Sequence, residues 1–74
     1  MKHILLVEDH SIVRLATLFI IRALLPAVTQ WETDNFPDAL QIASNRKLDL
    51  ILLDINIPDG EGFQMISKIR RLQP

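Results

Sequence analysis

Two uninterrupted apolar runs, each followed at once by carboxylates, set the pattern of this sequence. Residues 4–7 (Ile-Leu-Leu-Val) precede Glu8 and Asp9, and residues 50–53 (Leu-Ile-Leu-Leu) precede Asp54. Four large apolar residues in a row are typical of a strand that is buried on both faces, as in a parallel sheet. The pattern therefore predicts two central parallel strands, each with acidic side chains where it leaves the core.

The segment between these runs predicts a helix followed by a weaker strand. Residues 12–25 form the first predicted helix, with Ser11 as its N-cap and Pro26 as the residue that ends it. Residues 28–33 alternate moderately between the two faces of a strand, which is typical of an edge strand.

Two further helices are predicted, one before and one after the second apolar run. Residues 37–45 begin with Pro37, which suits a first helical turn, and the inward positions of this helix are Ala39, Leu40, Ile42 and Ala43. Pro58, Gly60 and Gly62 predict a sharp turn after the second run. Residues 62–72 then form the last predicted helix, whose buried side chains are Phe63, Ile66 and Ile69.

The predicted order is β-α-β-α-β-α, in a chain of 74 residues that can hold one domain. Such alternation predicts an α/β fold with a parallel sheet and right-handed crossovers. The two most apolar strands should be neighbours, with the weaker strand outside them, so the expected strand order is 2-1-3. The carboxyl ends of strands 1 and 3 would then lie side by side at the switch point where such sheets bind ligands.

Composition narrows the class of protein. The chain has no Cys, a net charge of −1 and 49% apolar residues. These values argue against disulfides, against a nucleic-acid surface and against a disordered chain. The apolar run at the N-terminus is too short for a signal peptide, and no apolar stretch is long enough to span a membrane. We expect a cytoplasmic protein that binds neither nucleic acid nor membranes.

The three carboxylates at the strand ends predict a cation site. Two unit charges about 4 Å apart repel by roughly 4 kcal/mol at an effective dielectric constant near 20. If Glu8, Asp9 and Asp54 converge, either one of them is protonated or a cation lies among them. Oxygen ligands alone favour Mg²⁺, and the backbone carbonyl of Asn56 could supply one more oxygen. A carboxylate beside Mg²⁺ can also attack phosphorus to form an aspartyl phosphate.

Other interpretations apply to single residues. Strand ends are often acidic simply because they meet water, and this would explain any one of the three carboxylates. His10 could be a fourth metal ligand, but a solvated loop residue beside the acidic pocket is the preferred interpretation. No general acid–base pair or substrate pocket is visible, so we do not expect an enzyme.

Taken together, these motifs resemble the receiver domain of two-component response regulators. Residues 4–10 resemble the first strand and acidic pair of that family, and residues 54–62 resemble its phosphoacceptor strand and loop. A His after the acidic pair (His10) and an Arg in the first helix (Arg14) make the sequence similar to the LuxR/NarL-type subfamily. The resemblance implies a flavodoxin-like (CheY-like) fold, a phosphoryl group accepted by Asp54 from a histidine kinase, and Mg²⁺ held by Glu8 and Asp9.

The family has five strands, and residues 1–74 correspond to the first three βα units of a receiver domain. We therefore expect an exposed edge on strand 3 and an uncovered apolar face on the first helix. Both predict a homodimer. The alternative to phosphotransfer is an interaction module that works by association alone.

Overall fold

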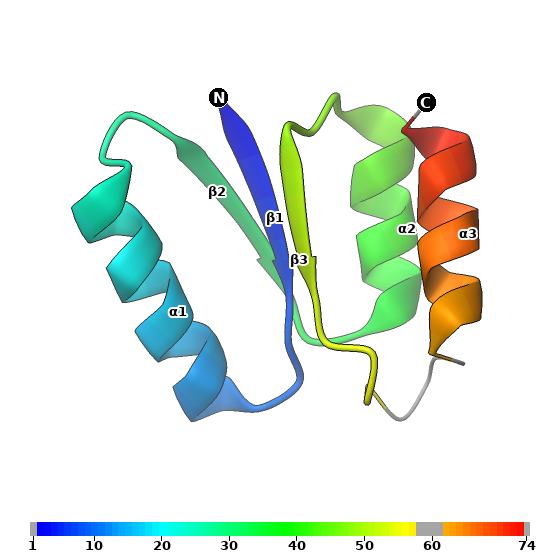
Figure 1. The fold of residues 1–74 in the computed structure, drawn as a ribbon, viewed down its shortest axis with the longest axis horizontal. Helices are drawn as coiled ribbons and strands as arrows, with labels where there is room; N and C mark the ends of the chain where they lie inside the picture. The colour runs from blue at the N-terminus through cyan, green and yellow to red at the C-terminus, as the bar shows by residue number, and fades with distance from the viewer. Residues whose placement is uncertain (1, 58–61, 74) are drawn as a thin grey trace.

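The structure, a computed structural model, describes residues 2–57 and 62–73 and shows the predicted alternation of strands and helices (Figure 1). The described elements are β1 (His3–Val7), α1 (Ser11–Leu24), β2 (Thr29–Thr33), α2 (Phe36–Asn45), β3 (Leu50–Leu53) and α3 (Phe63–Leu72). The turn predicted at residues 58–60 lies outside the described residues. Among the described helices, none is long and apolar enough to cross a membrane.

The three strands form one parallel sheet in the order β2-β1-β3, which confirms the predicted topology. In the register, Leu5 of β1 lies between Trp31 of β2 and Ile51 of β3. β1 is the most buried element, because it has a strand on each side. β3 is less buried than predicted, and Leu50 is 37% exposed. The reason is its position, because no described strand pairs with its second edge, and this agrees with the exposed edge predicted for the third strand.

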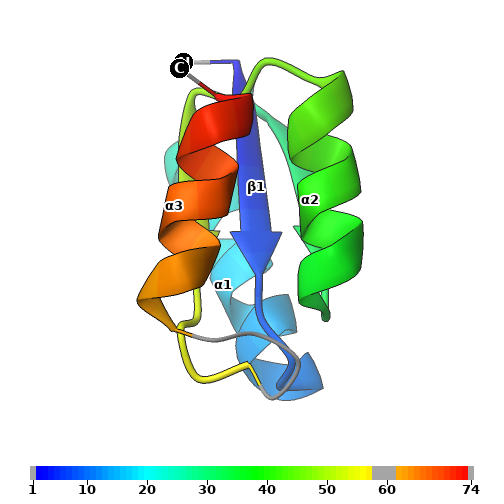
Figure 2. The same cartoon turned by 90° about the vertical axis from the view of Figure 1, so that its right-hand side faces the viewer.

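Helices cover both faces of the sheet (Figures 1 and 2). α1 lies on one face, and α2 and α3 lie side by side on the other. The core between the sheet and the paired helices contains these buried side chains: Leu5, Val7, Phe36, Ala39, Ile57, Met65 and Ile69. Alternate residues of a strand point to opposite faces, so Ile4 and Leu6 face α1. The inward positions predicted for α2 are confirmed, because Ala39 and Ala43 are buried and Leu40 and Ile42 pack against the core.

α1 makes limited contact with the sheet. Leu18 and Ile21 are its buried residues. Its outward face is strongly apolar, and three of its large side chains are at least 74% exposed: Ile12, Phe19 and Leu24. The helix is therefore apolar on both its inner and its outer face, as the sequence pattern predicted.

Two local predictions were wrong. The N-cap of α1 is His10, which makes no side-chain capping bond, and Ser11 is already the first helical residue. The Ser11 hydroxyl is therefore one position too late to cap the helix. In α3, Phe63 is 75% exposed, whereas Met65 is 1% exposed. Met65 and Ile69 lie one helical turn apart and define the buried face, and Phe63, two residues before Met65, points away from it.

The amino end of the sheet is closed by polar contacts. The carboxylate of Asp49 accepts the backbone N–H groups of Lys2 and His3 at 2.8 and 2.9 Å. The Arg46 guanidinium lies 3.7 Å from the centre of the Trp31 ring, and the Trp31 indole N–H donates to His3 Nδ1. The carboxyl end of the sheet, by contrast, gathers acidic side chains.

Candidate metal and phosphoacceptor site

The sheet itself brings the acidic residues to one place. Leu53, the last residue of β3, pairs with Val7, the last residue of β1. The residues that follow these two strands, Glu8 and Asp54, therefore leave the sheet at the same edge. The backbone N–H of Asp54 donates to the Val7 carbonyl at 3.0 Å, which continues the ladder past the strand ends.

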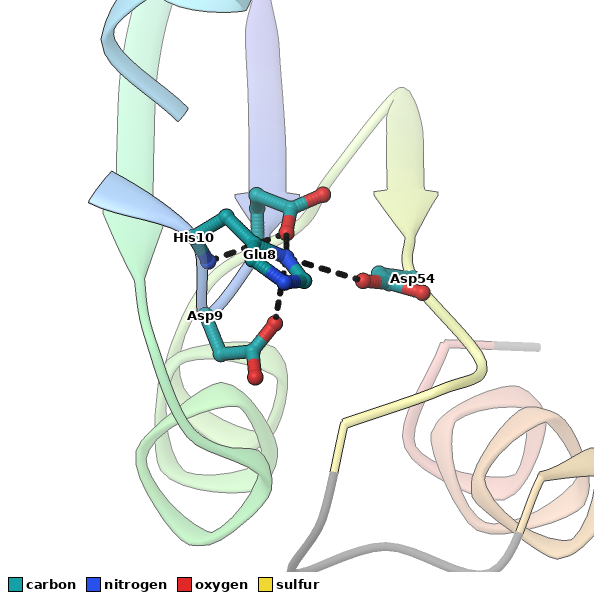
Figure 3. Close-up of side chains that lie close together, drawn as sticks. All are labelled: Glu8, Asp9, His10 and Asp54. Atoms are coloured by element: carbon teal, nitrogen blue, oxygen red, sulfur yellow. Dashed lines mark hydrogen bonds and ion pairs between the residues drawn. The ribbon is translucent and has the colours of Figure 1, made fainter. Parts of the chain in front are cut away.

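The structure brings Glu8, Asp9 and Asp54 together, with His10 beside them (Figure 3). One potential ligand atom from each of the four residues lies within 4.8 Å of all the others. His10 Nδ1 lies 2.8 Å from Glu8 Oε1, 3.1 Å from Asp9 Oδ1 and 4.0 Å from Asp54 Oδ2. Carboxylates held this close need a counter-charge.

His10 lies on the solvent side of these carboxylates and, when protonated, offsets part of their charge. Its side chain is 68% exposed, whereas the Glu8 side chain is 12% exposed. The hydrogen bond to Glu8 raises the pKa of His10, and the negative charge of Asp9 raises it further. Glu8 Oε1 also accepts the backbone N–H of His10 at 3.0 Å. His10 is thus an exposed residue turned toward the pocket, and its role as a solvated residue rather than a metal ligand stays a prediction.

Asp54 is oriented by its own loop. Its Oδ1 accepts the backbone N–H of Asn56 at 2.9 Å. Its Oδ2 lies 4.0 Å from His10 Nδ1. The side chain of Asp54 is 19% exposed. One oxygen of this carboxylate is therefore fixed by the backbone, and the other faces a pocket that is open to solvent.

The donor set suits a hard divalent cation. It consists of carboxylate oxygens from two adjacent strand ends, the ligands that Mg²⁺ prefers. Asp9 Oδ1 is buried and accepts no hydrogen bond from the described part of the chain, with His10 Nδ1 as its ion-pair neighbour. A buried carboxylate oxygen without a hydrogen-bond donor is a natural metal ligand, so the residues present fit Mg²⁺.

Sequence reasoning missed one residue at this site. Arg14 of α1 donates from Nη1 to the backbone carbonyl of Glu8 at 2.9 Å. In the sequence it served only as a mark of subfamily. The sequence shows a single cationic residue in the first turns of a helix that follows two carboxylates. It does not show which atom this residue contacts.

The chain matches a known family over nearly its whole length. The family model "Response regulator receiver domain" matches residues 4–74. KdpE, the KDP operon transcriptional regulatory protein of Escherichia coli, is 35% identical over 72 residues, which are 96% of this chain and 31% of KdpE. NarL, the nitrate/nitrite response regulator protein of Escherichia coli, is 31% identical over 67 residues, which are 90% of this chain and 31% of NarL.

Solved structures agree with this match. The MaeR response regulator bound to beryllium trifluoride superposes with a TM-score of 0.85 at 30% identity, over 96% of this chain and 58% of MaeR. A MaeR mutant bound to sulfate gives a TM-score of 0.86 at 26% identity, over 99% of this chain and 60% of the mutant. The chain thus spans about a third of the curated relatives and about three fifths of the solved structures.

The strand order, the helices on both faces and the structural neighbours are those of a partial flavodoxin-like, CheY-like fold. Receiver domains are signalling modules of two-component systems, and histidine kinases phosphorylate them. With residues 4–74 matched by the family model, this chain belongs to the response regulator receiver domain family.

Proposed function

We propose that this chain is a phosphoacceptor module, in which Asp54 receives a phosphoryl group from a histidine kinase. Glu8, Asp9, Asp54 and the backbone carbonyl of Asn56 would hold the Mg²⁺ that the reaction needs. The observation that carries the proposal is the convergence of three carboxylates at the adjoining ends of β1 and β3, in a chain of the receiver family.

The chemistry follows from the position of Asp54. Its Oδ2 is the oxygen that faces the pocket, while its Oδ1 accepts a backbone hydrogen bond. Attack by Oδ2 on the phosphorus of a phosphohistidine forms the O–P bond of an acyl phosphate as the P–N bond breaks, and the leaving imidazole takes up a proton from water. Bound Mg²⁺ would offset the charge of the phosphoryl oxygens. Glu8 and Asp9 would hold the cation beside the acceptor.

Intact-mass spectrometry with a small-molecule phosphodonor and Mg²⁺ tests this assignment. We expect a Mg²⁺-dependent gain of one phosphoryl group that is lost in Asp54→Asn. Asp49→Asn is the matched control, because it removes a carboxylate from the opposite edge of the sheet, and it should be phosphorylated as the unaltered chain is. No gain in the unaltered chain, or an unchanged gain in Asp54→Asn, would contradict the proposal.

A calorimetric titration with Mg²⁺ tests the ligand set separately. Asp9→Asn should weaken Mg²⁺ binding by more than roughly tenfold, because loss of a ligand costs at least as much as loss of a group that orients one. Asp49→Asn should bind Mg²⁺ normally. Equal affinity in all three proteins would remove Asp9 from the ligand set.

The finer parts of the assignment are also proposals. The family match favours the receiver function over an interaction module without phosphotransfer. The relative NarL supports the LuxR/NarL-type subfamily, as do His10 and Arg14. We further propose that the module acts in the cytoplasm as a signalling module and not as an enzyme, and that it binds no nucleic acid itself.

Self-association is the last part of the proposal. The outward face of α1 carries large exposed apolar side chains, and the second edge of β3 has no strand partner among residues 2–57 and 62–73. Unpaired strand edges and apolar helix faces both favour association with a second copy. The homodimer therefore stays a prediction, whose test is given in the Discussion.

A further inference from the structure

The Arg14 side chain joins α1 to the carboxyl ends of two strands. Its Nη1 donates to the Glu8 carbonyl at 2.9 Å, and its Nε lies 3.4 Å from Glu32 Oε1. The Arg14 side chain is 21% exposed, although its neighbours Ile12 and Leu15 are 80% and 71% exposed. A guanidinium that is bonded on two sides and partly buried has a fixed direction.

The loop between β1 and α1, residues 8–10, is held mainly at its backbone. The Glu8 N–H donates to the Thr33 carbonyl at 3.0 Å, and the Glu8 carbonyl accepts from the Arg14 side chain. The His10 carbonyl accepts the backbone N–H of Arg14 at 2.8 Å. Arg14 thus contacts this loop twice, through its main chain and through its side chain, and the same loop carries Glu8 and Asp9.

Few other bonds hold this end of α1. The helix has no side-chain cap and no acidic residue in its first turn. Apart from Arg14, one further side-chain hydrogen bond links α1 to the sheet among the described residues, from Gln30 Nε2 to the Leu18 carbonyl at 3.1 Å. That bond lies about one turn further along α1. The orientation of the loop therefore depends on Arg14 together with the hydrogen bonds from His10 to the Glu8 carboxylate within the loop.

We infer that Arg14 is a positioning residue for the acidic site. By fixing the Glu8 carbonyl, it holds the backbone from which the Glu8 and Asp9 carboxylates face Asp54, and so it sets the affinity of the site for a divalent cation. This inference rests on the proposed Mg²⁺ site. The loop geometry, however, is present without a metal, so it can be tested by itself.

The sign of the effect separates positioning from charge. Removal of a cation near three carboxylates makes the pocket more negative, and this alone would strengthen Mg²⁺ binding. Loss of the loop geometry would weaken it, because metal ligands that lose an orienting partner bind about 10- to 100-fold less tightly. A weaker Mg²⁺ site after loss of Arg14 can therefore not come from the missing charge.

The test uses three variants of this chain. Arg14→Met keeps the apolar stem and removes every donor, Arg14→Lys keeps the charge and a single donor group, and Arg22→Met removes a charge from an exposed position of the same helix. Amide hydrogen exchange is measured by NMR on the metal-free proteins, and Mg²⁺ affinity is measured on the same samples. The Asp54 amide, bonded to the Val7 carbonyl across the sheet, is the internal reference.

In Arg14→Met we expect exchange at the Glu8 and His10 amides to rise about three- to tenfold, as the loss of one hydrogen bond allows. Mg²⁺ affinity should fall about tenfold or more. Arg14→Lys should lie between Arg14→Met and the unaltered chain, and Arg22→Met should match the unaltered chain in both measurements. If Arg14→Met does not fold, the inference is tested by comparing Arg14→Lys with Arg22→Met in the same two measurements.

Unchanged exchange at Glu8 and His10 in Arg14→Met would overturn the inference, and so would Mg²⁺ binding as tight as in the unaltered chain or tighter. If the unaltered chain binds no Mg²⁺, the proposed function loses its metal site. The exchange data then still decide whether Arg14 positions the loop, so the two failures are distinguishable.

Discussion

At the scale of single residues, hydrogen bonds from backbone amides give exposed carboxylates a defined role. Asp49 is exposed to solvent, yet its carboxylate accepts the N–H groups of Lys2 and His3. These two bonds favour the charged form, so the pKa of Asp49 lies below its ordinary value of 3.8. The carboxylate thereby ties the start of β1 to the start of β3.

Asp49→Asn should lower the thermal unfolding midpoint at neutral pH, and this effect should depend on pH. Because the pKa of Asp49 is lower in the folded than in the unfolded chain, its stabilising contribution is complete above pH 3.8 and is lost as the pH falls through the folded value. The two midpoints should therefore converge in acid. Calorimetric scans from neutral pH to below 3.8 measure this, and a constant difference would contradict the prediction.

The exposure of two α3 side chains predicts opposite results for similar substitutions. Met65 is 1% exposed in the core, whereas Phe63 is 75% exposed. Met65→Ala should lower the free energy of unfolding by about 2–5 kcal/mol, because it leaves a cavity. Phe63→Ala should change it by less than about 0.5 kcal/mol. Urea titrations measure both, and a larger loss in Phe63→Ala would place Phe63 on the buried face.

At the scale of the elements, the two helices that follow β1 and β2 begin differently. α2 has a side-chain N-cap, since Asn35 Oδ1 accepts the Asp38 N–H at 2.8 Å. α1 has none, although Ser11 lies at its start. The start of α1 is instead tied to the sheet by Arg14, which bonds to the end of β1.

Alanine substitutions compare these two helix starts directly. Asn35→Ala should lower the free energy of unfolding by about 0.5–2 kcal/mol, because an orphan amide of the first turn loses its acceptor. Ser11→Ala is the matched control and should change it by less than about 0.5 kcal/mol. If Ser11→Ala were as costly as Asn35→Ala, the Ser11 hydroxyl would be a cap after all. Chemical denaturation monitored by circular dichroism measures both values.

At the scale of the whole molecule, one surface stands out. The side of α1 that points away from the sheet exposes several large apolar residues, including Ile12, Leu15 and Phe19. Scattered apolar residues are normal on a protein surface, but a continuous apolar helix face marks a contact site. The proposed occupant of this face is a second copy of the chain.

Sedimentation velocity at several micromolar concentrations tests this self-association. We expect dimers in the unaltered chain and a shift toward monomer when Leu15 and Phe19 are replaced by Glu. Since Leu15 and Phe19 are 71% and 75% exposed, this double change should leave the thermal unfolding midpoint of the monomer nearly unaltered. An unaltered chain that is monomeric at every concentration would contradict the prediction.

The sequence by itself determined the order of the elements, the strand order and the positions of the three carboxylates. Apolar runs and helical spacing depend on the geometry of the chain over a few residues, so the printed residues reveal them. The adjacency of β1 and β3, and with it the meeting of Glu8 and Asp54, follows from the high apolarity that these two strands share. The family resemblance rests on the same local motifs.

Only the tertiary structure decided which residues of each element turn inward and which distant groups meet. In the structure, Leu18 and Ile21 of α1 face the sheet, and Met65 lies in the core where Phe63 was predicted. The Arg14 side chain donates a hydrogen bond to the Glu8 carbonyl. These outcomes depend on how whole elements are rotated when they pack against one another, and local periodicity does not specify that rotation for a helix that is apolar on more than one side.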